Sequence, residues 1–273
     1  MDILRIGKQS FSTIRSHKYL LFFGFFVASG GGAGANTGAH GHHGGPLPAW
    51  IWPLLAGALV LGLAALVMNV LSEAALIDGV ERAQHGERGR IGEELRASRR
   101  HFWTLAAIKV ALGAAMVLSV AVVALPIGGA LAGAYPVLAG AVATALLALV
   151  AVPWLLTLYF IYMYAMRIAV LDDKKAMDSI RAAKRYLHGR IAGSLELLVA
   201  GGLGSVAVEI VGVLVALPIA ALGLGVYFLA GLVPALVVGG VLVAPVALVV
   251  AGAVGAYRSS LWTLGFLDGR AAI

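Results

Sequence analysis

The sequence predicts an all-α protein, a polytopic helix bundle embedded in a membrane, with six spans arranged as three helical hairpins. Three observations predict this fold class: the composition, the long apolar runs and the placement of Lys and Arg. Of the 273 residues, 61% are hydrophobic and only 12% are charged, whereas soluble domains average about 45–50% apolar and about 25% charged residues. So few charges cannot cover the surface of a soluble core, and an integral membrane protein is expected.

Five apolar runs are long enough to cross a membrane, because each exceeds the ~20 residues that span the hydrocarbon core. They lie at 47–71, 102–125, 137–166, 191–217 and 226–257. A sixth, shorter segment at 19–35 reads YLLFFGFFVASGGGAGA. We interpret this segment as the short first arm of hairpin one. A cleaved signal peptide and a re-entrant half-helix are the alternatives.

The runs pair into hairpins at 19–71, 102–166 and 191–257, within a single membrane domain over 1–273. Its parts are hairpin one (1–71), hairpin two (72–166), hairpin three (167–257) and a cytoplasmic tail (258–273). Proline marks the end of two outgoing helices, at Pro126 and Pro218, and recurs inside the returning helices at Pro153 and Pro245. A basic segment precedes each hairpin, as IRSHKYL, LRASRRHF and IRAAKRYL. These matches indicate an internal repeat.

Small residues inside the apolar runs predict close helix packing. Many of the 36 glycines lie there, and two pairs have the small-xxx-small spacing that lets membrane helices approach closely. These pairs are Gly201 with Ser205, and Gly252 with Ala256.

The placement of Lys and Arg predicts the orientation. Of the 20 basic residues, 19 lie at 1–18, 72–101, 167–190 and the C-terminal segment; the exception is Lys109. The intervening loops at 31–46, 126–136 and 218–225 contain no Asp, Glu, Lys or Arg. Because basic loops stay in the cytoplasm, we expect both termini to be cytoplasmic in a multi-pass protein of the cell membrane. The net charge of +7 then reflects topology, and no nucleic-acid partner is expected.

Two cytoplasmic segments have the pattern of amphipathic helices. In 91–102, Ile91, Leu95, Ser98 and Phe102 recur at helical spacing, and in 174–188 Met177, Ile180 and Leu187 do the same. Asp172 and Asp173 are placed to cap the second helix. The cations beside these stripes are candidate contacts for anionic lipid headgroups: Arg96, Arg99, Arg100, Arg181, Lys184 and Arg185. Simple topology anchors with a solvated face are the alternative.

Three charged residues lie within predicted spans: Lys109, Glu196 and Glu209. Charges in hydrocarbon are costly and often functional. Lys109 and Glu196 lie at similar depths, so they are expected to pair or to extend to the interface. Glu209 lies deeper, and a proton- or cation-binding carboxylate is one interpretation of it.

No recognised catalytic or metal motif is present. His40, His42 and His43 lie in a glycine-rich segment without an accompanying carboxylate or cysteine, so a flexible outer loop is favoured over a metal site. The aromatic cluster Tyr159, Tyr162 and Tyr164 is typical of an interfacial belt. We expect no cofactor, no metal and no enzymatic activity.

The cytoplasmic segments carry a resemblance. ALIDGVERAQHGE, LRASRRHFW and RIAVLDDKKAMDSIRAAKRYL resemble segments of a loose group of bacterial six-span membrane proteins of unknown function. They also resemble the membrane domain attached to some glycerophosphodiester phosphodiesterases. The resemblance implies a six-span topology in an inner membrane. It carries over no hydrolase activity, since the chain has no phosphodiesterase barrel, and no site residues.

Two functions remain open from the sequence. One is a non-enzymatic membrane scaffold or regulatory module that contacts anionic lipid and a protein partner or a second copy of itself. The other is a transporter of a small solute, ion or lipid that uses Glu209 with Lys109 and Glu196.

Overall fold

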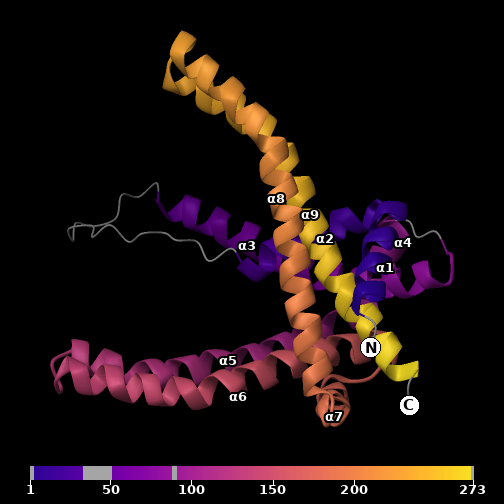
Figure 1. Ribbon diagram of the computed structural model, residues 1–273, viewed down its shortest axis with the longest axis vertical. Coiled ribbons are helices and arrows are strands. Elements are labelled where there is room, and N and C mark those ends of the chain that lie inside the picture. The colour runs from indigo at the N-terminus through magenta and orange to yellow at the C-terminus, as the bar shows by residue number, and fades with distance from the viewer. Residues whose placement is uncertain (1–2, 33–50, 88–90, 272–273) are drawn as a thin grey trace. The chain divides into compact units, whose positions relative to one another are not determined.

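The computed structural model describes residues 3–32, 51–87 and 91–271 (Figure 1). Within these residues the chain is helical and contains no strand. Its helices are α1 (Ile3–Ser16), α2 (Tyr19–Gly32), α3 (Ile51–Gln84), α4 (Ile91–Ser98), α5 (Phe102–Leu131), α6 (Val137–Leu171), α7 (Ala176–Leu187), α8 (Ile191–Ala230) and α9 (Leu232–Ala271), with a 3-10 turn at Arg99–His101. The all-α prediction is confirmed.

Five of these helices are long and apolar enough to cross a membrane: α3, α5, α6, α8 and α9. This supports the prediction of a multi-pass membrane protein. The predicted sixth span corresponds to α2, which has only 14 residues. At about 1.5 Å per residue it reaches about 21 Å, less than the ~30 Å hydrocarbon core. Six spans in three hairpins therefore stay a prediction, and the outer loop with His40, His42 and His43 lies outside the described residues.

The chain contains two compact units: unit one comprises residues 1–99 and 197–273, and unit two comprises residues 100–196. In unit one, α2 packs against both α9 and α3. Leu20 and Phe23 of α2 are 0% exposed. The amide of Asn69 on α3 donates a hydrogen bond of 2.6 Å to the carbonyl oxygen of Phe26. A helix too short to span by itself thus lies at the centre of this unit.

Glycines bring α2 and α9 into backbone contact. A Cβ atom on Gly24 would collide with the Gly252 carbonyl oxygen and, at 2.6 Å, with the Ala256 nitrogen. A Cβ atom on Gly255 would in turn collide with the carbonyl oxygen of Gly24. The predicted close packing at Gly252 and Ala256 is confirmed, and its partner is α2.

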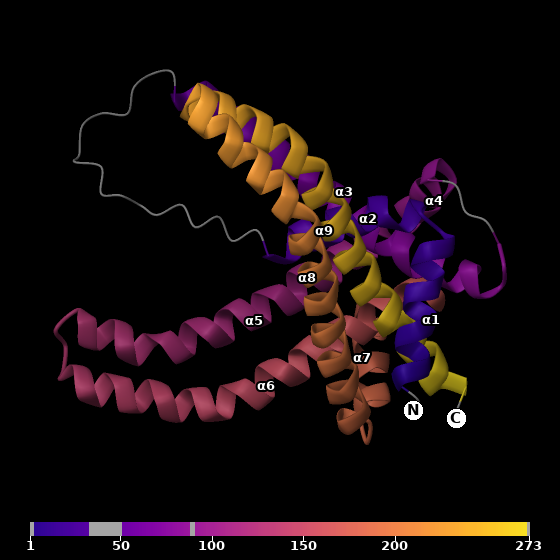
Figure 2. The same ribbon diagram turned by 45° about the horizontal axis from the view of Figure 1, so that its top comes forward.

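The helices α8 and α9 run antiparallel and side by side (Figures 1 and 2). Glycines again mark the contact: a Cβ on Gly201 would lie 3.3 Å from Leu261, and the facing pairs continue along the helices as Gly204 with Tyr257, Gly212 with Val250 and Gly223 with Gly239. Gly231, with φ +89°, forms the turn between the helices. Positive φ carries little steric penalty at glycine, so the chain reverses there.

The prediction that Pro126 and Pro218 end the outgoing helices is wrong. Pro126 lies inside α5 and Pro218 lies inside α8. Proline removes one backbone hydrogen bond, but transmembrane helices tolerate this loss where neighbouring groups compensate. The register of α8 and α9 sets Pro218 opposite Pro245, and both ribbons bend together in Figure 1.

Unit two is built on the antiparallel pair α5 and α6. Trp154 Nε1 on α6 donates a hydrogen bond of 3.2 Å to Ser119 Oγ on α5. Near the turn, a Cβ on Gly140 would lie 2.5 Å from the Cβ of Ala130. Helix α7 packs against α6 and α5. Much of the apolar surface of α5 and α6 is exposed, as expected for helices that face lipid: Val117, Leu118, Leu125, Leu146, Leu149 and Val150.

The predicted capping of α7 by Asp172 and Asp173 is wrong. Helix α7 begins at Ala176 with Lys175 at the N-cap position and no side-chain capping bond. Asp172 instead ends α6 and accepts a hydrogen bond of 2.9 Å from Lys174 Nζ. Asp173 has φ +50° and lies 3.5 Å from His101 Nδ1. Both aspartates therefore stabilise the turn between the helices.

Candidate functional site

The structure places the cations of α7 on one outward face. Arg181, Lys184 and Arg185 are all exposed. The opposite face of the helix is buried, through Ser179, Ala183 and Leu187. The predicted apolar stripe is only partly right, since Met177 is 59% exposed and Ile180 is half-buried. Because the buried face anchors α7 within unit two, its three cations form a basic surface, in which Arg181 Nη1 also lies 3.6 Å from Asp178 Oδ1.

The segment 91–102 also has an exposed basic face and a buried face, but its buried face is polar. Arg96, Arg99 and Arg100 are exposed. Ile91, predicted as part of the apolar stripe, is 41% exposed. The buried side chains of α4 are Glu94 and Ser98. A polar face therefore packs inward.

The burial of Glu94 is an unexpected feature of this segment. Its side chain is 0% exposed, and Oε1 lies 3.4 Å from Arg82 Nη1. Its Oε2 has no hydrogen-bond partner among the described residues. Arg82 also binds Asp78 at 2.8 Å. Burial raises the pKa of the Glu94 carboxyl above its usual value of 4.5, against the lowering effect of Arg82, and Asp78 adds to the rise.

This raised pKa predicts a pH-dependent stability of unit one. A carboxyl whose pKa is higher in the folded than in the unfolded state favours folding most when it is protonated. Stability is therefore lost as the pH rises from about 4.5 through the folded-state pKa. We expect Glu94→Gln to remove this loss and to raise the melting temperature in detergent by a few degrees at neutral pH.

The control for this prediction is Glu93→Gln, because Glu93 is exposed on the same helix. Its melting temperature should keep most of the parent's pH dependence, because the charge of Glu93 raises the Glu94 pKa less than burial does. A lower melting temperature of Glu94→Gln at neutral pH would mean that the ion pair with Arg82 outweighs the cost of burial.

The three intramembrane charges differ in their surroundings. Glu209 is exposed on α8, beside the exposed side chains Val206, Ile210 and Val213. It faces outward from unit one. In unit two, Glu196 is exposed and Lys109 is half-buried, and their pairing stays a prediction.

The aromatic cluster of α6 lies partly inside unit two, in contrast to the predicted interfacial belt. Tyr164 is 3% exposed, and its hydroxyl lies 2.9 Å from Ser194 Oγ. The ring centroid of Tyr186 on α7 lies 4.8 Å from that of Tyr164, and the Arg190 guanidinium lies 4.8 Å from the Tyr186 centroid. The cluster therefore connects α6, α7 and the start of α8.

A buried cation near this cluster was not anticipated. Arg167 is 2% exposed, and its Nη1 donates a hydrogen bond of 2.6 Å to the carbonyl oxygen of Met163. Its position at the end of an apolar run gave no signal of this burial, because a cation there is usually expected to extend to the interface.

Among the described residues, no group of three or more His, Asp or Glu side chains is placed to hold a metal ion. The geometry instead offers fixed basic surfaces beside long apolar helices. Such surfaces suit contacts with anionic headgroups.

A family model described as "Domain of unknown function (DUF7847)" matches residues 1–183, more than half of the chain. This range ends within α7. No curated protein and no solved structure matches the chain.

Proposed function

The chain belongs to the DUF7847 family, and we propose that it is a non-enzymatic membrane scaffold or regulatory module with basic helices at the cytoplasmic leaflet. In this proposal it crosses the cell membrane six times, with both termini in the cytoplasm. Its basic segments contact anionic lipid headgroups.

The observation that carries this proposal is the division of α7 into two faces. Its buried face is fixed against α5 and α6, and its three cations are exposed. A cation near an anionic leaflet contributes about 1 kcal/mol of binding. Because the helix is already ordered, little conformational entropy is lost when lipid binds.

The position of Glu209 supports a scaffold role over transport. Its side chain points outward among exposed apolar residues. A carboxyl there is costly against lipid, whereas a polar partner on another membrane helix lowers this cost. A second copy of the chain or a partner protein would supply such a helix.

The headgroup contact is tested by neutralising the cations of α7. The protein is reconstituted into vesicles of phosphatidylglycerol and phosphatidylcholine and extracted with its surrounding lipid in polymer nanodiscs. We expect enrichment of phosphatidylglycerol around the parent and none around Arg181→Gln/Lys184→Gln/Arg185→Gln, because three lost cations at about 1 kcal/mol each correspond to roughly a hundred-fold in affinity.

The matched control keeps the charge, as Arg181→Lys/Lys184→Arg/Arg185→Lys, and should retain the enrichment. Added salt should reduce the enrichment of the parent, because salt screens exposed charges. Equal enrichment around the parent and the neutral variant would contradict the proposed headgroup contact.

A further inference from the structure

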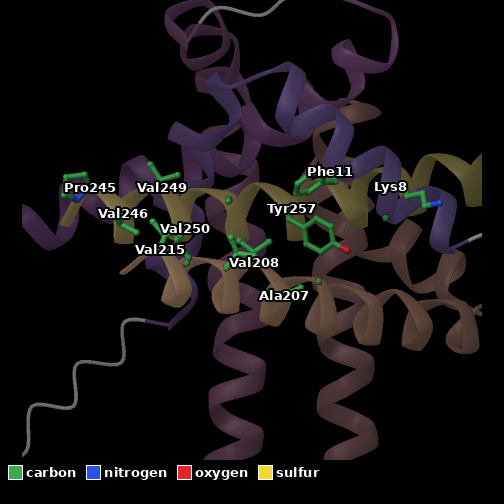
Figure 3. Close-up of a pocket in the computed structure, with 15 residues that line it drawn as sticks. Lys8, Phe11, Ala207, Val208, Val215, Pro245, Val246, Val249, Val250 and Tyr257 are labelled. Atoms are coloured by element: carbon green, nitrogen blue, oxygen red, sulfur yellow. The ribbon is translucent and has the colours of Figure 1, made fainter. Parts of the chain in front are cut away.

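An apolar groove of about 840 Å³ runs along α8 and α9 in unit one (Figure 3). Pro245 lies near one end. Lys8 and Phe11 of α1 approach the other end, beside Tyr257. The Tyr257 hydroxyl points toward the Lys8 end in this view. The groove therefore has an apolar end and a polar end.

The lining has the chemistry of a hydrocarbon site. Branched aliphatic side chains line both walls: Val208, Val211 and Val215 from α8, and Val246, Val249 and Val250 from α9. Small residues such as Gly204, Ala207 and Ala253 also line it. Apart from Lys8 and Tyr257, every lining residue is apolar or glycine.

The groove also has the length of one membrane leaflet. From Pro245 to Tyr257 the helix α9 advances by about 18 Å, at about 1.5 Å per residue. The whole hydrocarbon core is ~30 Å thick, so the groove covers a little more than half of it. A chain lying along it from the Tyr257 end would end near the middle of the bilayer.

A cation is available at the polar end. Lys8 is exposed and has no ion-pair partner among the described residues. Asp268 of α9 is paired with another cation of α1, since its Oδ1 lies 2.7 Å from Arg5 Nη2. The charge of Lys8 is therefore free to bind an anion at the mouth of the groove, and its position on the basic N-terminal segment matches the predicted cytoplasmic side.

We propose that the groove holds one acyl chain of an anionic phospholipid from the cytoplasmic leaflet, with the lipid phosphate bound by Lys8. This inference rests on the membrane location in the proposed function. It adds a specific site, on helices other than α7, for a single lipid. Apolar burial along the walls supplies the affinity, and Lys8 supplies the preference for an anionic headgroup.

Native mass spectrometry of the detergent-purified protein tests this site, with phosphatidylglycerol or phosphatidylcholine added. We expect the parent to retain one phosphatidylglycerol more tightly than further lipids. Lys8→Gln should weaken this binding about five-fold, corresponding to about 1 kcal/mol, and Lys8→Arg should preserve it. Val211→Trp fills the groove and should abolish tight binding of both lipids.

Two controls match these variants. Val213→Trp introduces the same ring on α8 at a residue that is 61% exposed and does not line the groove. Lys18→Gln removes an exposed cation of the N-terminal segment that lies outside the groove lining. Both should retain the lipid, and the melting temperature of each variant establishes that it is folded.

The outcomes separate this proposal from the headgroup contact of α7. Unchanged binding in Val211→Trp would overturn the groove proposal, whatever the neutral α7 variant does. A dimer in the parent that Val211→Trp converts to a monomer would also overturn it, because a second copy would then occupy the groove. The groove proposal is supported if Val211→Trp loses the tightly bound lipid and the neutral α7 variant keeps it. This holds even if the neutral α7 variant also keeps its phosphatidylglycerol enrichment, a result that would contradict only the headgroup contact of α7.

Discussion

Replacing Gly24 by leucine should separate α2 from α9 and destabilise unit one. A Cβ atom at this position meets backbone atoms of Gly252 and Ala256, which cannot move aside as a flexible side chain would. Overpacking in a close-packed interior typically costs about 1–3 kcal/mol, and we expect the upper end of this range or more. Gly255→Leu should act in the same way, since its Cβ meets the Gly24 carbonyl oxygen.

The matched control is Gly240→Leu on α9, where an added Cβ has no neighbour within 4 Å. It should retain the stability of the parent in thermal and SDS-induced unfolding, because leucine also has a higher helix propensity than glycine. Equal melting temperatures for Gly24→Leu and Gly240→Leu would show that α2 does not pack on α9 as described.

Trp262→Ala should give the second large loss of stability. Trp262 is 1% exposed, within the stretch 259–266 where every residue is buried. Removing a buried Trp typically costs about 3–5 kcal/mol, because the cavity collapses only partly. Thermal unfolding in detergent should show a lower melting temperature, and Trp262→Phe should show an intermediate one.

Trp52→Ala is the control for this change, since Trp52 of α3 belongs to the same unit and is 62% exposed. Its substitution should change the melting temperature little. If Trp52→Ala were as destabilising as Trp262→Ala, burial in unit one would not explain the loss.

The sequence predicted the helices because length and apolar character identify long membrane helices almost without tertiary information. It was less informative about where they end. Pro126 and Pro218 were expected to stop α5 and α8. Both helices instead continue past these prolines, and the turns after them contain Gly133 and Gly231, where φ is positive. The tail predicted at 258–273 continues α9 to Ala271. Helix α9 packs against α1, α2 and α3, and no local pattern shows these contacts.

The exposed cations could be predicted from the sequence, whereas the buried acid and the groove could not. The six cations predicted to contact headgroups are all exposed, because their spacing on amphipathic segments is a local property; the contact itself stays a prediction. The buried Glu94 was not identified, since an acid in the first turn of a short basic helix is typical of a solvated face. The groove was also missed, because it joins Lys8 to residues of α8 and α9 that are about 200 positions away in the sequence.

The joint bend of α8 and α9 has a consequence for the surrounding bilayer. From Leu232 to Tyr257, where the groove reaches its polar end, α9 extends for about 38 Å at about 1.5 Å per residue. That exceeds the ~30 Å hydrocarbon thickness. The pair therefore cannot stand straight along the membrane normal with all of this apolar surface covered by lipid. The mismatch requires tilting, kinking or local thickening of the bilayer, and the facing prolines supply a kink that both helices share.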